Sequence, residues 1–234
     1  MIASAKNFRS LLSSCGPYTV GVALLGIILP LRMNDEGFSV LLIGLIMVAY
    51  YAGQALGGHF SKKILFRVGH IRAFTVFAAA GAAALLAYDP FFSAPTWFAL
   101  RLVNGFCFAG MATTIESWLN DHSNSENRGK VLSVYMIVQY LSVAIGQLLI
   151  NIGSIDQPDL FMLAAALVSL SLIPVAVTRL PEPVLEKYRP FGVRILFRKC
   201  SIGSIGAMTA GMLLGTFYSM GVVFTDELGF SVAD

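Results

Sequence analysis

Charged side chains and cysteines are scarce in this 234-residue chain. Only 12% of the residues are charged whereas 56% are hydrophobic, and the mean hydropathy is +0.74. This composition excludes an ordinary soluble domain and indicates an integral membrane protein. The three cysteines have no disulfide or metal spacing, and no phosphate-binding loop or nucleophile–base pair stands out. We therefore expect no enzymatic activity, no metal site and no cofactor.

Long apolar windows are what the chain has instead. A helix needs about 20 apolar residues to cross a bilayer. Seven windows meet this requirement, at residues 11–31, 41–60, 71–88, 97–119, 131–152, 160–177 and 202–224. The sequence therefore predicts an all-α integral membrane protein with seven transmembrane helices. The sixth is nearly featureless, so we expect it to face lipid.

Basic residues fall almost entirely on one side of these windows. Fourteen of the 16 lysines and arginines precede the first window or follow the second, fourth and sixth; the exceptions are Arg32 and Arg101. Because basic loops stay inside, we expect a cytoplasmic N-terminus and an inner (plasma) membrane location. This orientation explains the net charge of +3 without a nucleic-acid partner. Arg32 either forms an external gate with Asp35 or Glu36 or anchors the helix end.

A change of composition divides the chain into three parts. Residues 1–179 hold six windows, residues 180–200 are rich in proline and mixed charge, and residues 201–234 hold the seventh window. We expect a six-helix bundle, a cytoplasmic linker that could be an amphipathic surface helix, and the first helix of a second half.

A short repeat supports two halves. Gly-Phe-Ser-Val follows the first window at residues 37–40 and returns 192 positions later at residues 229–232. Parallel repeats in transporters are related by an axis along the membrane normal, so the second half should have about 190 residues. Only its opening helix is present, and we expect a truncated product or a fragment.

Two ionisable residues interrupt the fourth window. Arg101 and Glu116 are fifteen positions apart, and at about 100° per residue they share a broad helix face. Such groups at membrane depth usually point into a bundle interior or a watery cavity and mark a functional path. The alternative is that both snorkel to the headgroup level. The interior position is preferred for Arg101, and both positions stay open for Glu116.

Other polar side chains are expected to share that interior. Tyr50 and Gln54 lie four apart in the second window, Asn104 follows Arg101 by three, and Gln139 belongs to a polar stripe in the fifth. In lipid these groups would lack partners, so they should face the bundle. They either line a solute cavity or hydrogen-bond neighbouring helices.

The charged segment at residues 57–72 joins the second and third windows, and we expect a cytoplasmic loop there. Its motif positions are Gly57, Lys62, Lys63, Arg67, Gly69 and Arg72. The run resembles the loop motif between helices two and three of the major facilitator superfamily. The family usually has an aspartate after the glycine, where this chain has Ser61, and the spacing here is longer by a few residues.

The fourth window extends this resemblance. Arg101-x-x-x-Gly105 is similar to the family's buried-arginine motif, which is associated with proton coupling. Residues 116–120 with Arg128 and Gly129 look like a bacterial subgroup of unknown substrate. The glycine–proline motif that drug antiporters carry in helix five is missing. The resemblance covers essentially the whole chain and implies the family's six-helix N-terminal bundle plus a seventh helix, with the second half truncated.

Two functions remain. The first is a secondary transporter that moves a small solute, with protons as one option for coupling, by alternating access in its full-length form. Arg101 and Glu116 would then handle charge or protons, and Tyr50, Gln54, Asn104 and Gln139 would line the cavity. The second is a shortened chain that no longer transports and acts as a structural subunit of a larger membrane protein complex.

Overall fold

The computed structural model describes residues 2–153, 157–178 and 193–229. Its elements, in chain order, are α1 (Ile2–Asp35), α2 (Val40–Val68), α3 (His70–Leu86), α4 (Ala94–Asp121), α5 (Arg128–Leu148), the 3-10 helix η1 (Leu149–Ile152), α6 (Asp159–Leu170), α7 (Leu172–Ala176), α8 (Val193–Lys199) and α9 (Ser201–Glu227). Across the described residues, six helical segments are long and apolar enough to cross a membrane, counting α5 with η1 and α6 with α7. The apolar helix α3 has 17 residues. Every predicted window thus coincides with a helix, which confirms the all-α membrane fold.

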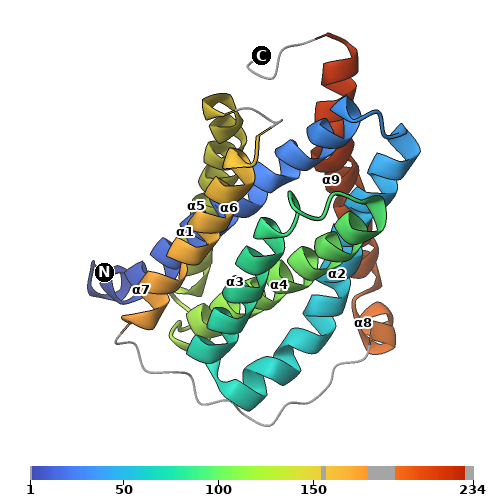
Figure 1. Ribbon diagram of the computed structural model, residues 1–234. Helices are drawn as coiled ribbons and strands as arrows, with labels where there is room; N and C mark the ends of the chain where they lie inside the picture. The colour runs from blue at the N-terminus through green and yellow to red at the C-terminus, as the bar shows by residue number, and fades with distance from the viewer. Residues whose placement is uncertain (1, 154–156, 179–192, 230–234) are drawn as a thin grey trace.

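Helix α1 connects the two sides of the bundle. It packs on α5, α6 and α7, and it also contacts α9, α2 and α4. Figure 1 shows α5, α6 and α7 to the left, α2 and α9 to the right, and α3 and α4 between them. The bundle therefore surrounds α1 with helices that are distant in sequence.

Glycine brings α2 and α4 into direct backbone contact. A Cβ atom on Gly53 or Gly57 of α2 would meet the carbonyl oxygens of Leu102 or Phe106 on α4. A Cβ on Gly105 of α4 would likewise meet the Tyr50 carbonyl on α2. The small-x-x-x-small pair at residues 53–57 therefore packs tightly, as its spacing predicts. This contact sets the positions of Tyr50 and Arg101 relative to each other.

The connection between α2 and α3 is a single residue, Gly69. Its φ of +83° lies in the region that side chains avoid, so glycine permits the reversal. Residues 57–68 belong to α2 and residues 70–72 to α3. The prediction of a loop over residues 57–72 is therefore wrong. The apolar pattern ends near Lys62 and Lys63, but lysine is a good helix former and the helix continues past it.

Helix α6 is more buried than the sequence suggests. Leu160, Ala164 and Val168 are buried, and α6 packs on both α1 and α3. The Ala164 carbonyl lies where a Cβ on Gly21 of α1 would be. The expectation that this segment faces lipid is therefore wrong for that side of the helix.

The linker and domain division stay predictions. Residues 180–192 of the predicted linker lie outside the described residues. Residues 193–199 form α8, and α9 begins two residues later.

Candidate functional site

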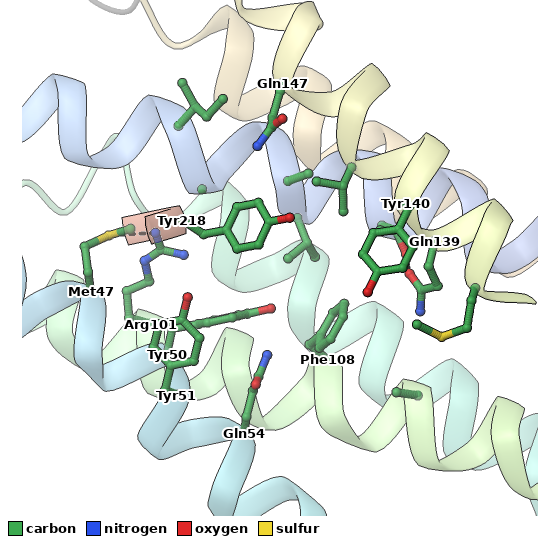
Figure 2. A pocket seen from close by; sticks show the side chains of 18 of the residues that line it. Met47, Tyr50, Tyr51, Gln54, Arg101, Phe108, Gln139, Tyr140, Gln147 and Tyr218 are labelled. Atoms are coloured by element: carbon green, nitrogen blue, oxygen red, sulfur yellow. Dashed lines mark hydrogen bonds between the residues drawn. The ribbon is translucent and has the colours of Figure 1, made fainter. Parts of the chain in front are cut away.

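A cavity of about 400 Å³ lies among five helices. Side chains of α1, α2, α4 and α5 form most of its wall, and Tyr218 comes from α9. Figure 2 shows how they point toward the cavity. The lining side chains with polar or ionisable groups are Thr19, Tyr50, Tyr51, Gln54, Arg101, Glu116, Tyr135, Gln139, Tyr140, Gln147 and Tyr218.

Five of the residues that the sequence assigns to a pathway line this cavity. They are Tyr50, Gln54, Arg101, Glu116 and Gln139. Tyr50 and Gln54 lie one turn apart on α2, and the close packing of α2 on α4 places Tyr50 beside Arg101. The grouping is therefore as expected, and the role of each residue stays a prediction.

Arg101 is buried at one end of the cavity with only 2% of its surface exposed. Its Nη2 donates to the Sδ of Met47 at 2.8 Å, and its guanidinium lies 5.4 Å from the centre of the Tyr50 ring. Its Nε has no hydrogen-bond partner. Arg101 forms no ion pair with a carboxylate in the part of the chain that the structure describes. A cation thus faces the cavity with only weak acceptors around it.

Glu116 occupies another part of the cavity wall and is linked to α1 through α5. The Tyr135 hydroxyl lies 3.4 Å from Glu116 Oε1 and donates to it. Gln139 Nε2 donates to the Tyr135 oxygen at 2.9 Å, and Thr19 donates to Gln139 Oε1 at 2.6 Å. The Glu116 side chain itself is exposed. The carboxylate therefore lies in the cavity wall at one end of a hydrogen-bond chain across three helices.

Two predicted pathway residues lie elsewhere. Asn104 is buried and donates through Nδ2 to the Tyr88 hydroxyl at 3.2 Å, so it joins α4 to the end of α3 instead of lining the cavity. Arg32 forms an ion pair with Glu36 at 3.0 Å near the end of α1 and does not line the cavity. The pairing that the sequence proposed for Arg32 is present. The position of Arg32 agrees with either alternative, an external gate or an anchor of the helix end.

The charged motif is also separate from the cavity. Lys62, Lys63, Arg67 and Arg72 are exposed on α2 and α3. Gly57 is buried against α4, and Ser61, where the family usually has an aspartate, is buried as well. Only the glycines of this motif have a structural role that these contacts explain.

Several cavity residues were not predicted. Tyr135 and Gln147 were visible only as members of the polar stripe on α5. Tyr51, next to Tyr50, was expected only to face the bundle. Thr19, Met47 and Tyr218 carry no signal of their own, because only the packing of α1, α2 and α9 brings them to the cavity. Gly215 of α9 accepts a hydrogen bond from Tyr51 at 3.3 Å, which holds α9 beside the site.

A second contact joins the ends of α1 and α9. Asn34 Nδ2 donates to Asp226 Oδ2 at 2.8 Å. These residues are 192 positions apart, which is the offset of the Gly-Phe-Ser-Val repeat. If the repeat reflects two related halves, the contact joins equivalent positions of its two copies.

Known proteins are similar to this chain in sequence. The family model of the Major Facilitator Superfamily matches residues 11–234. The chain is 25% identical over 223 residues to a protein named "Uncharacterized MFS-type transporter YcaD" from Escherichia fergusonii, covering 94% of this chain and 58% of that protein. It is 28% identical over 229 residues to the protein of that name from Escherichia coli O139:H28, covering 95% and 59%.

A solved structure has the same fold. It is described as "Crystal structure of auto inhibited POT family peptide transporter", and it superposes with a TM-score of 0.62 at 15% sequence identity, over 93% of this chain and 48% of that one. The chain spans about three fifths of the length of the YcaD relatives. With a family match over nearly its whole length, the chain belongs to the major facilitator superfamily.

Proposed function

We propose that this chain provides the solute cavity of a secondary transporter that moves a small solute across the membrane by alternating access. The observation that carries the proposal is the buried Arg101 facing a cavity of about 400 Å³. An ionisable group at membrane depth is costly and is kept where it meets a solute or an ion. Membership of a transporter family supports this reading.

Protons are the coupling ion in this proposal, and Glu116 is their carrier. It is the acidic residue in the cavity wall, and its partners come from α5 and, through Gln139, from α1. A carboxylate in the wall of a solute cavity can exchange protons with solvent when water enters that cavity. Its hydrogen bond to Tyr135 connects its protonation to the packing of α5.

The orientation belongs to the same proposal. The exposed basic side chains of α2 and α3 favour a cytoplasmic position for the junction of these helices, and with it a cytoplasmic N-terminus. The cavity would then be loaded from either side of a plasma or inner membrane as the helices rearrange.

Proton flux in vesicles tests the proposal. The chain is reconstituted into liposomes that contain the pH-sensitive dye pyranine, and sugars, amino acids, organic acids and amines are added under a proton gradient. Addition of one solute class should acidify the interior of the liposomes. Arg101→Ala should lower this flux by about tenfold or more, because a hydrogen bond to a charged group is lost. Glu116→Gln should remove the dependence of the solute flux on pH.

Two results would contradict it. Unchanged flux in both variants would remove the assigned roles, and absence of flux for every solute class would remove transport by this chain. The structural-subunit alternative makes a different prediction. Purification from native membranes would then yield a stoichiometric complex with another membrane protein.

A further inference from the structure

The charge of Arg101 is not neutralised by the residues around it. Met47 offers a thioether sulfur, which is a weak acceptor, and Tyr50 offers the face of its ring. Neither group carries a negative charge. The guanidinium Nε lacks a hydrogen-bond partner although the residue is 2% exposed. Because buried charges are normally paired, this position calls for an anion.

Glu116 is too distant to be that anion. It is fifteen residues away on the same helix, which is about 22 Å along the helix axis. The carboxylate is instead engaged with Tyr135. The cavity therefore has a positive end at Arg101 and a separate acidic position, and the missing negative charge must come from a molecule that enters the cavity or from another protein segment.

The walls indicate what kind of anion fits. Tyr50, Tyr51, Phe108 and Tyr218 surround the space next to Arg101 (Figure 2). Rings and a thioether favour an apolar or aromatic body. Among the described residues that line the cavity there is no lysine or histidine, so Arg101 supplies the positive charge of this wall. One cation matches a monovalent carboxylate better than a divalent phosphate group, and its fork can bind both carboxylate oxygens.

We propose that the solute of this cavity is a small organic monocarboxylate, with its carboxylate on Arg101 and its apolar body against the tyrosine and phenylalanine rings. This inference rests on the proposed transport function and names the substrate class for the same cavity. Arg101 supplies specificity for the anion, and the amide side chains of Gln54 and Gln139 are available for polar substituents.

Binding to the purified chain in lipid nanodiscs tests the inference. The probes are benzoate, isovalerate and indole-3-acetate, with benzamide as the neutral counterpart of benzoate and inorganic phosphate as the competing anion. At least one carboxylate should bind, and benzoate at least about tenfold more tightly than benzamide. Arg101→Met should abolish the difference between benzoate and benzamide, and Arg101→Lys should retain part of it. Lys130→Met is the control, since Lys130 is an exposed cation of α5 that does not line the cavity, and it should leave benzoate binding unchanged.

The thermal stability of the protein without added carboxylate gives an independent test of the inference. If the Arg101 charge is unpaired, Arg101→Met should raise the Tm, because an apolar side chain replaces a buried uncompensated cation. A fall in Tm would mean that the protein itself compensates the Arg101 charge, and this would overturn the inference. Absence of binding by all three carboxylates, equal binding of benzoate and benzamide, or preferred binding of phosphate would overturn it too.

The outcomes also separate this inference from the transport proposal. Carboxylate binding without flux in vesicles would remove transport and keep the anion site. Flux of a neutral or cationic solute that Arg101→Met leaves unchanged would keep transport and remove the anion site.

Discussion

At the scale of single residues, the cavity joins two kinds of polar group. Among the described residues, Arg101 is buried without a charged partner, whereas Glu116, Tyr135, Gln139 and Thr19 are linked by hydrogen bonds across α4, α5 and α1. The first arrangement leaves binding capacity for a solute. The second uses its hydrogen bonds to hold three helices at fixed positions around the cavity.

Gln139→Leu should destabilise the bundle by about 0.6 kcal/mol or more, because the interhelical hydrogen bond from Thr19 of α1 is lost together with the bond to Tyr135 within α5, and an interhelical bond contributes about 0.6 kcal/mol in membrane proteins. Thermal unfolding in detergent measures the change. Gln147→Leu is the control, since Gln147 lines the same cavity and makes no side-chain hydrogen bond to the described residues. Equal effects of the two variants would argue that the chain from Thr19 to Glu116 contributes no stability.

Residue roles were harder to predict than helix positions. Arg101 was placed correctly because lipid excludes an arginine so strongly that few positions are possible. Asn104 was not, because a mildly polar side chain can be satisfied on several faces of α4, and here Tyr88 satisfies it. The cavity position of Tyr218 depends on the docking of α9, which local sequence does not encode.

At the scale of helices, the α2–α4 contact positions side chains that line the cavity. Its glycines allow the two backbones to touch, and the same contact brings Tyr50 to Arg101. The approximate bounds of the helices could be predicted, since bilayer thickness sets the length of an apolar window. The continuation of α2 beyond that window could not be predicted from hydropathy, because lysines outside the membrane core do not stop a helix.

Gly57→Ala and Gly58→Ala form a matched pair on α2. The new methyl group at residue 57 would meet the Phe106 carbonyl and Ala109 of α4, whereas nothing lies within 4 Å at residue 58. We expect Gly57→Ala to cost about 1–3 kcal/mol through overpacking. Gly58→Ala should be neutral or slightly stabilising, because alanine is the better helix former.

Thermal unfolding in detergent compares the two variants. A similar Tm for both would mean that α2 and α4 separate easily, and it would contradict the role given to their contact.

At the scale of the whole molecule, the structure combines a six-helix bundle with α9 at its side. Both the order of helices and the family could be predicted from the sequence. The apolar windows give the helices, and the basic segment at residues 57–72 and Arg101 follow one another in the order that the family has. The docking of α9 through Tyr51 and Asp226 could not, since each contact joins residues more than 160 positions apart.

The orientation of the molecule can be tested with its own cysteines. Cys200 is exposed at the start of α9, whereas Cys15 and Cys107 are buried. If the N-terminus is cytoplasmic, a membrane-impermeant maleimide should label Cys200 in inside-out vesicles and leave it unlabelled in right-side-out vesicles. Cys200→Ser is the control and should abolish labelling. Labelling from the outer face alone would reverse the orientation proposed here.

The Asn34–Asp226 contact also bears on how the two halves diverged. If α1 and α9 descend from one duplicated segment, the ancestral copies carried identical side chains at these positions. Two aspartates in such a contact would repel each other. Asparagine on one copy and aspartate on the other provide a donor and an acceptor, so under such a duplication a change at one copy gives a hydrogen bond that two aspartates would not make.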